Sequence, residues 1–402
     1  MVLRGTGGGT SYIVSLKTHS VAVSVNDGTV AAWDRGGRLY SLYQDGVTSR
    51  RGLNGQVLVK RDRAGEHRHV RLAGAEAAAV VATAAAIARA AVGAMRSSGW
   101  RWAGPVDGVT SQEATTLLDL CGRFDPDAAR ADADRFRRVY SPIGMLPPDQ
   151  YLSLVVQATE GCSFNTCTFC GLYDETYRVK SPDEFAGHLS AVVGYLGESI
   201  TLRSRGIFLG AANALAVPMA RLLPIFEILV EDADAIRRGV YAFVDGFTGA
   251  LKDSRDYRLL HHLGLRRVYV GLESGHDPLL AYVRKPGAAT AAIDTVRAIK
   301  TAGVNVGVIV MIGLGGERFA AGHVADTINA VNLMGLGAGD VIYFSNLVEL
   351  AGTTYPVLAV ETRLSPLSVS ERDAQRHAIR AGLQFAGAPP QISSYDIREF
   401  VY

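Results

Sequence analysis

Three of the four cysteines in this chain lie close together and could ligate a metal centre. Cys162, Cys167 and Cys170 have a C-x4-C-x2-C spacing, which lets three thiolates from one loop converge on a single centre. A structural zinc site normally has four protein ligands, and an iron–sulfur cluster held by cysteines alone also needs four. Three local ligands therefore indicate an iron–sulfur cluster with one iron open to an exogenous ligand.

Two other interpretations of the cysteines remain open. Cys121, the fourth cysteine, could complete the ligand set, but it lies in the apolar helical run Thr115–Cys121, where a small buried hydrophobic residue is expected. A distant histidine could instead complete a zinc site. No cysteine follows Cys170, so the sequence provides ligands for one cluster only.

The cysteine loop follows the first of six predicted strands. From Gln150 onward, apolar β-branched runs alternate with amphipathic helical stretches. The predicted strands are Leu152–Ala158, Gly206–Leu209, Val240–Asp245, Arg267–Leu272, Val304–Ile312 and Asp340–Leu347. Consecutive βα units predict the α/β class, with a full or partial parallel (β/α)6 barrel of the TIM type. A doubly wound sheet is the competing architecture, and in both the chemistry belongs at the C-terminal ends of the strands.

Polar residues at these strand ends are candidates for catalysis. Asp245 ends the third strand, Tyr343 lies on the sixth, and Glu349 follows it. We expect all three at the barrel mouth, where each could bind substrate or serve as a structural hydrogen-bond partner. Arg284 and Lys285 follow the fourth strand and could meet a substrate carboxylate, but a solvated loop pair is the favoured interpretation.

The chain before the barrel has a different pattern. Short alternating runs between Thr10 and Lys60, separated by Asn/Asp/Gly turns, predict an antiparallel meander, and helical stretches follow it. We therefore expect an N-terminal α+β module at 1–148, the barrel at 149–350 and a helical or irregular extension at 351–402. Gly5–Gly9 is expected to be a mobile terminus.

Composition narrows the class of partner. Lys+Arg 41 against Asp+Glu 39 gives a net charge of +2, which disfavours a nucleic-acid partner and favours a small molecule, with a peptide substrate as an alternative. Met1–Gly9 lacks the pattern of a secretion signal. The Ala-rich stretch Ala75–Met95 is long enough to span a membrane but contains Glu76 and Arg89, and we expect a packed helix of a cytoplasmic protein.

The cysteine loop and the strand ends resemble the radical S-adenosylmethionine (radical SAM) superfamily. Its usual signature is C-x3-C-x2-C, and this chain has one extra residue in the first spacer. The resemblance covers about residues 150–350 and is nearest to oxygen-independent coproporphyrinogen oxidase-like proteins. It implies that the cluster is a [4Fe–4S] cluster and that Cys162, Cys167 and Cys170 hold it.

The same resemblance assigns residues to S-adenosylmethionine (SAM). Phe169 takes the place of the residue beside the adenine, and the segment ending Gly210-Ala211-Ala212-Asn213 takes the place of a glycine-rich motif that receives the methionine amino group. That motif often has an acid, and here Asn213 or backbone carbonyls must serve. Glu273 occupies the ribose- and methionine-contacting strand, and Gly313 and Gly315 a turn along the adenine.

The chemistry implied by the resemblance is reductive cleavage of SAM to a 5′-deoxyadenosyl radical that abstracts hydrogen from a substrate. It requires a reductant such as flavodoxin or ferredoxin. Motifs for cobalamin, a phosphate loop and auxiliary clusters are absent from the sequence. An iron–sulfur electron-transfer or sensor protein and a zinc interaction protein remain as alternatives.

Overall fold

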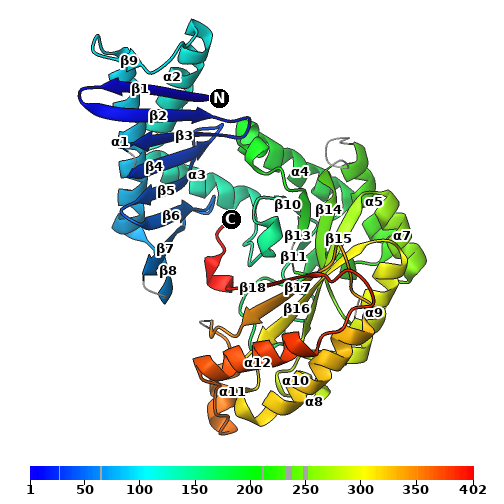
Figure 1. Cartoon of the computed structure of the whole chain (residues 1–402). Coiled ribbons are helices and arrows are strands. Elements are labelled where there is room, and N and C mark those ends of the chain that lie inside the picture. Colours follow the sequence, from blue (N-terminus) through cyan, green and yellow to red (C-terminus); the bar gives the residue numbers. More distant parts are fainter. Residues whose placement is uncertain (27, 64–65, 211, 232–237, 248–251, 351) are drawn as a thin grey trace. The chain divides into compact units, whose positions relative to one another are not determined.

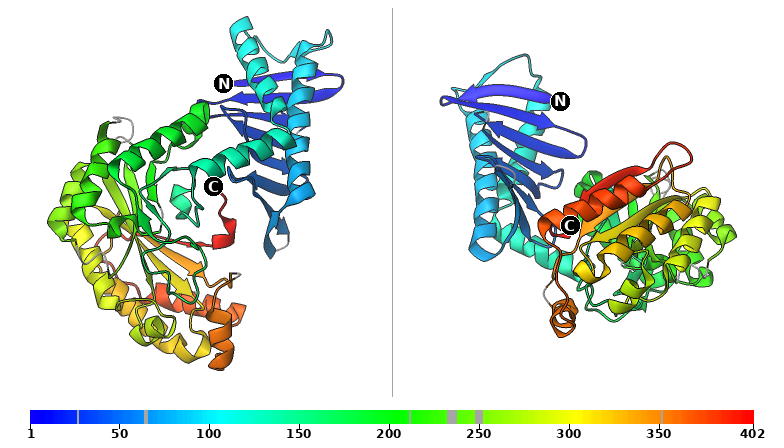
Figure 2. Two further views of the ribbon diagram at one scale, coloured as in Figure 1. Left: turned by 180° about the vertical axis from the view of Figure 1, so that it is seen from behind. Right: turned by 60° about the horizontal axis from the view of Figure 1, so that its bottom comes forward.

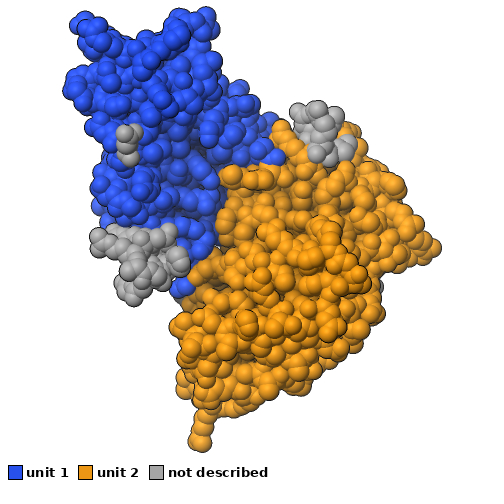
Figure 3. All heavy atoms as spheres, viewed as in Figure 1, with its two compact units in different colours: residues 1–141, 190–204, 398–402 blue, residues 142–189, 205–397 orange. Residues whose placement is uncertain are grey.

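A computed structural model describes residues 1–402 except 27, 64–65, 211, 232–237, 248–251 and 351 (Figure 1). The chain divides into two compact units, coloured separately in Figure 3. One contains Met1–Ser141, Ser190–Ser204 and Arg398–Tyr402, and the other Pro142–Leu189 and Arg205–Ile397. The proposed boundaries at 148/149 and 350/351 stay predictions.

The N-terminal unit contains a nine-stranded antiparallel sheet in the order β8-β7-β6-β5-β4-β3-β2-β1-β9. The strands are β1 (Val2–Gly7), β2 (Thr10–Leu16), β3 (Ser20–Val25), β4 (Thr29–Asp34), β5 (Leu39–Gln44), β6 (Val47–Arg51), β7 (Val57–Arg63), β8 (Glu66–Leu72) and β9 (Arg101–Trp102). Alternating burial along β2 and β3 fits a sheet with one face on the core. The predicted meander is therefore present and is longer than the sequence suggested.

The glycine-rich start is part of this sheet, so the expectation of a mobile terminus is wrong. Gly5 and Gly7 lie on β1, which pairs with β2 and β9. A Cβ on Gly5 would lie 2.0 Å from Cζ2 of Trp100. Glycine is needed here because the indole of Trp100 packs directly against the strand.

Helices α1 (Gly74–Arg96), α2 (Gly108–Arg123) and α3 (Pro126–Val139) belong to this unit together with the last turns of α4 (Pro182–Leu196), and α1 runs across the strands in Figures 1 and 2. Its small buried residues, such as Ala84, Ala88 and Ala91, pack in one core with Trp33 and Leu118. Of the helices that the structure describes, α1 alone is long and apolar enough to cross a membrane. Length and composition are weak evidence for a span, because core helices pass the same test.

The second unit is built on a seven-stranded parallel sheet in the order β10-β13-β14-β15-β16-β17-β18. Its strands are β10 (Leu154–Gln157), β13 (Ile207–Gly210), β14 (Val240–Asp245), β15 (Leu265–Glu273), β16 (Asn305–Ile312), β17 (Val341–Asn346) and β18 (Gln391–Tyr395). The first six confirm the predicted α/β sheet, and β18 adds a strand within the stretch expected to be helical or irregular. Strands β10 and β18 stand at the two ends of this order, so the barrel is partial. A separate pair is formed by β11 (Thr159–Glu160) and β12 (Arg178–Val179).

Helices between the strands cover the outer side of the curved sheet (Figure 2). They are α4 (Pro182–Leu196), α5 (Met219–Glu231), α7 (Ser254–His262), α8 (Asp277–Tyr282), α9 (Ala289–Thr301), α10 (Gly316–Leu333), α11 (Tyr355–Glu361) and α12 (Val369–Gly382). All four residues of both β10 and β13 are buried, as expected for strands covered on two faces. The sheet therefore forms the core and directs its C-terminal ends to one side.

His323, on α10, predicts a loss of stability in acid. Its ring is fully buried with Nδ1 2.7 Å from Oγ of Ser274, and burial lowers the pKa of His323 from 6.5 to about 4. The folded ring stays neutral while the unfolded ring takes up a proton below pH 6.5, so stability falls as the pH drops from 6.5 toward 4. We expect a loss of about 2 kcal/mol between pH 7 and pH 5 in urea unfolding.

His323→Gln is the variant that isolates this contribution, because it removes the titrating ring. Its unfolding free energy should change less between pH 7 and pH 5 than that of the unsubstituted protein. Equal pH dependence in the two proteins would contradict the assignment.

Candidate active site

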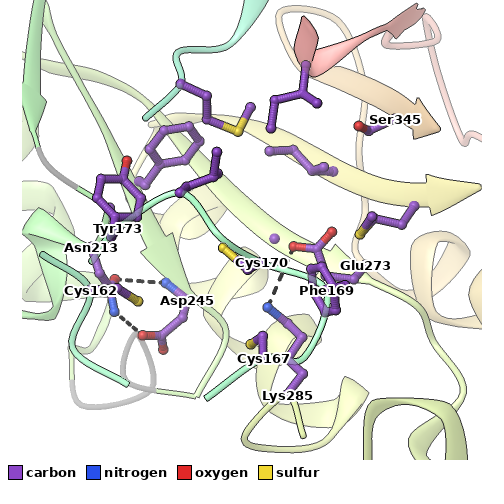
Figure 4. Close-up of a pocket in the computed structure, with 18 of the residues that line it drawn as sticks. Cys162, Cys167, Phe169, Cys170, Tyr173, Asn213, Asp245, Glu273, Lys285 and Ser345 are labelled. Atoms are coloured by element: carbon purple, nitrogen blue, oxygen red, sulfur yellow. Dashed lines mark hydrogen bonds and ion pairs between the residues drawn. The ribbon is translucent and has the colours of Figure 1, made fainter. Parts of the chain in front are cut away.

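A pocket opens at the C-terminal ends of the barrel strands (Figure 4). The loop after β10 contributes the three cysteines, β14 and β15 contribute acidic side chains, and β16–β18 contribute mostly apolar ones. The lining residues include Met145, Cys162, Phe164, Cys167, Phe169, Cys170, Leu172, Tyr173, Asn213, Phe243, Asp245, Phe247, Gly271, Glu273, Lys285, Ile309, Met311, Ser345, Asn346, Val348, Leu350, Tyr395 and Ile397. All of them belong to the second unit.

The cysteine loop is held by hydrogen bonds to the end of α8 and to α11. The backbone N–H of Thr168 donates to the carbonyl of Val283 (2.9 Å), and the N–H of Tyr355 donates to the carbonyl of Thr168 (2.9 Å). Oγ1 of Thr166 donates to the carbonyl of Arg284 (3.2 Å). Gly161 begins the loop with φ +67°, and a Cβ there would lie 2.3 Å from the carbonyl oxygen of Glu175. The three thiols are thus presented by a fixed loop.

The three cysteine thiols line one pocket. Within the described part of the chain, no group of three or more His, Cys, Asp or Glu residues is placed to hold a single metal ion. In an iron–sulfur cluster held by cysteines, each thiolate binds a different iron. Burial raises the pKa of Cys167 to about 12 and also raises the pKa of Cys170. These thiols are therefore neutral until a metal centre compensates the thiolate charge.

A buried ion pair stands beside the cysteines. Nζ of Lys285 lies 3.6 Å from Oε1 of Glu273, and each side chain is 13% exposed. Burial raises the pKa of Glu273, which Lys285 opposes. Burial alone would lower the pKa of Lys285, but the neighbouring carboxylates, Glu273 above all, outweigh it and the pKa is raised. Figure 4 shows the pair next to Cys167 and Cys170.

Asn213 and Asp245 form a second polar group. Nδ2 of Asn213 donates to Oδ2 of Asp245, and Oδ1 of Asn213 accepts the backbone N–H of Asp245 (2.9 Å). Nδ2 also donates to Oγ of Ser163 (2.8 Å), beside the first cysteine. The ends of β13 and β14 are thereby joined to the cysteine loop. Ala211 of the glycine-rich motif lies outside the described residues.

Seven of the predicted site residues line this pocket: Cys162, Cys167, Phe169, Cys170, Asn213, Asp245 and Glu273. Five do not. Tyr343 was expected at the mouth, but its hydroxyl donates to Oδ1 of Asp149 (2.7 Å), which precedes β10, and only 2% of the residue is exposed. Asp149 also accepts from Arg267 and from the hydroxyl of Tyr269. Tyr343 is thus hydrogen-bonded within this partly buried cluster and does not line the pocket.

The other four residues outside the lining are Glu349, Gly210, Gly313 and Gly315. Glu349 is exposed, although its neighbours Val348 and Leu350 line the pocket. The N–H groups of Gly313 and Gly315 donate to Oε1 of Gln375 (2.8 Å) and to the hydroxyl of Tyr355 (3.0 Å). The turn that contains these two glycines therefore precedes α10 and is hydrogen-bonded to side chains of α11 and α12.

Two groups of lining residues were missed in the sequence. Lys285 was expected in a solvated loop, yet it is buried against Glu273. Ser345 and Tyr395 were not singled out, and Tyr395 lies on β18. The sequence pattern that weakly indicates this strand is Pro389-Pro390 followed by the apolar residues Ile392 and Tyr395.

Residues 156–328 match the model of the radical SAM superfamily. The matched segment is a radical SAM domain, a domain of enzymes, and this superfamily uses a [4Fe–4S] cluster and SAM. No relative was found among curated proteins. The proposed kinship with the coproporphyrinogen oxidase-like branch stays a prediction.

Several solved structures are similar to this chain. Coproporphyrinogen III oxidase (HemN) from Escherichia coli has a TM-score of 0.41 at 16% identity, covering 61% of this chain and 54% of its own. The FeFe-hydrogenase maturase HydG from Carboxydothermus hydrogenoformans has a TM-score of 0.40 at 14% identity, and the match covers 67% of this chain and 64% of HydG. The cobalamin-dependent SAM radical enzyme OxsB has a TM-score of 0.39 at 12% identity, and the match covers 57% of this chain and 31% of OxsB. The chain thus spans less than two thirds of each of these proteins.

Gly271 on β15 gives a test of the packing around the ion pair. A Cβ at this position would lie 2.4 Å from Oε1 of Glu273 and 3.5 Å from Nζ of Lys285. Gly271→Ala should therefore displace the carboxylate and lower the unfolding free energy by about 1–3 kcal/mol in urea denaturation.

The matched control is Gly187→Ala, on the exposed face of α4 with no atom within 4 Å of the new Cβ. It should raise stability by about 0.5–1 kcal/mol, because glycine is a poor residue inside a helix. Similar effects of the two substitutions would show that Gly271 is not constrained by the pair.

Proposed function

We propose that this protein cleaves SAM reductively at a single [4Fe–4S] cluster held by Cys162, Cys167 and Cys170. When bound, the cluster and SAM supply a one-electron cleavage that generates a 5′-deoxyadenosyl radical, which abstracts hydrogen from a substrate. The observation that carries the proposal is that three thiols from one hydrogen-bonded loop line a single pocket at the C-terminal ends of the barrel strands.

The chain's own residues bind and orient the reactants. Phe169, Asn213 and Glu273, which line the pocket with the cysteines, are proposed to contact SAM. Asp245, held by Asn213, is proposed to face the substrate. The surrounding apolar side chains exclude water, which a radical reaction requires to avoid side reactions.

The substrate is proposed to be a small organic molecule, with a peptide as the alternative, and a flavodoxin or ferredoxin to be the electron donor. The near-neutral net charge of +2 supports a small molecule over nucleic acid. A cytoplasmic location fits the need for reduced cysteines.

The experiment is anaerobic reconstitution with iron and sulfide, followed by dithionite and SAM. Formation of 5′-deoxyadenosine, measured by chromatography and mass spectrometry, is the expected result. A reconstituted cluster that yields none would support an electron-transfer or sensor role. Zinc without iron or sulfide in anaerobically purified protein would support an interaction protein with a structural zinc site.

A further inference from the structure

The pocket has two chemically different ends. The cysteines, Glu273, Lys285 and Asp245 are contributed by the cysteine loop and by β14, β15 and the loops after them. The other end is contributed by β16–β18 and the segments that follow β17 and β18. In Figure 4, Ser345 marks this second end, away from Lys285 and Asp245.

The second end is built from uncharged side chains. The described lining residues of β16–β18 and the segments after them are Ile309, Met311, Ser345, Asn346, Val348, Leu350, Tyr395 and Ile397. Six of these eight are hydrophobic or aromatic. Such a surface favours apolar ligand atoms, and methionine adapts to irregular shapes.

Its polar groups are few and fixed. The ring of Tyr395 packs edge-on against Tyr343 at 5.5 Å between centroids, and burial raises the pKa of Tyr395, so its hydroxyl stays neutral. Oδ1 of Asn346 accepts from Nη2 of Arg376 (2.7 Å), whose Nη1 is paired with Asp373 (2.7 Å). The polar groups that this end offers to a ligand are therefore the hydroxyls of Ser345 and Tyr395, which are hydrogen-bonded to each other, and the side-chain amide of Asn346.

The charge of the pocket disfavours anions. Lys285 is the only cationic side chain among the described lining residues, and it is paired with Glu273. Asp245 adds a further carboxylate. A ligand with several carboxylates would meet no surplus positive charge here, and its own charges would be repelled in a partly dehydrated site.

We infer that the β16–β18 end of the pocket receives the body of the substrate, a neutral, mainly apolar small molecule with one or two hydrogen-bonding groups that also reaches Asp245, and that the site rejects polycarboxylates. This inference rests on the proposed function, since it concerns the substrate of the same site. It also separates this chain from enzymes that act on porphyrinogens with several carboxylates.

The test is equilibrium dialysis of the reconstituted holoenzyme with SAM against two probes. 1-Aminoanthracene is neutral and apolar, and coproporphyrin III carries four carboxylates. We expect 1-aminoanthracene to bind at one site at least 10-fold more tightly than coproporphyrin III. Equal or tighter binding of coproporphyrin III would overturn the inference.

Substitutions of lining residues test whether the probe binds in this pocket. Val348→Arg should weaken 1-aminoanthracene binding at least 10-fold, and Ser345→Asp should do the same if the first variant does not fold. Leu259→Arg, exposed on α7, is the control and should bind like the unsubstituted protein. Unchanged binding in a folded Val348 or Ser345 variant would overturn the assignment. Formation of 5′-deoxyadenosine by the same preparation is scored separately, so failure of the proposed function is distinguishable.

Discussion

Cys167→Ala should abolish both the cluster and SAM cleavage. With only Cys162 and Cys170 left on the loop, two of the irons would lack a protein ligand, and a [4Fe–4S] cluster would not be retained. The absorption expected at ~400 nm for a cysteine-ligated cluster should disappear, and iron, sulfide and 5′-deoxyadenosine should fall to background. Anaerobic reconstitution followed by spectroscopy and product analysis measures all of these.

Cys121→Ala is the matched control. Cys121 is fully buried in the core of the N-terminal unit, and burial raises its pKa, so it is a neutral packing residue. Its substitution should leave the chromophore and product formation unchanged, at a cost of about 1 kcal/mol in stability. Retention of the chromophore or of SAM cleavage in Cys167→Ala, or their loss in Cys121→Ala, would contradict the ligand assignment.

The parallel sheet could be predicted from the sequence because its strands are short apolar runs that end in turns. The predicted strand Val240–Asp245 has the same bounds in the structure, and Val304–Ile312 differs from β16 by one residue. Burial on both faces leaves such runs hydrophobic throughout, which is a strong local signal. Strand β18, with the sequence QISSY and no fully buried residue, carries no such signal.

The cysteines could be predicted as a group because their spacing alone brings them together. The role of a glycine or a tyrosine depends on residues far away in the chain. Gly313 was assigned to the SAM site by its motif, but its N–H is bonded by Gln375 on α12. The hydroxyl of Tyr343 is bonded by Asp149, 194 residues earlier. Tertiary contacts of this kind have no local signature.

Lys285 shows the same limit for charged residues. Its neighbour Arg284 adopts φ +55°, and the turn that follows α8 delivers the lysine to the pocket. A lysine in a glycine- and proline-containing loop is usually solvated, so burial could be recognised only once Glu273 was seen opposite it. A buried lysine requires a partner, which makes the pair a strong test of the site.

Lys285→Met should destabilise the barrel by about 3–5 kcal/mol, because it leaves the carboxylate of Glu273 buried without a counter-ion. The methionine fills a similar volume, so the loss reports the charge and not a cavity. Urea unfolding followed by circular dichroism measures it. Arg255→Met is the control, since Arg255 is paired with Asp253 but its side chain is 87% exposed, and this substitution should leave the unfolding free energy nearly unchanged.

The double variant Lys285→Met/Glu273→Leu distinguishes pairing from packing. Removing both charges leaves no uncompensated group, so its stability should return to within about 1 kcal/mol of the unsubstituted protein. A double variant as unstable as Lys285→Met would mean that the lysine acts through packing alone. If the double variant regains stability but no longer binds SAM, the ion pair is not needed for the free energy of unfolding. Its role would then be to place charge beside Cys167 and Cys170.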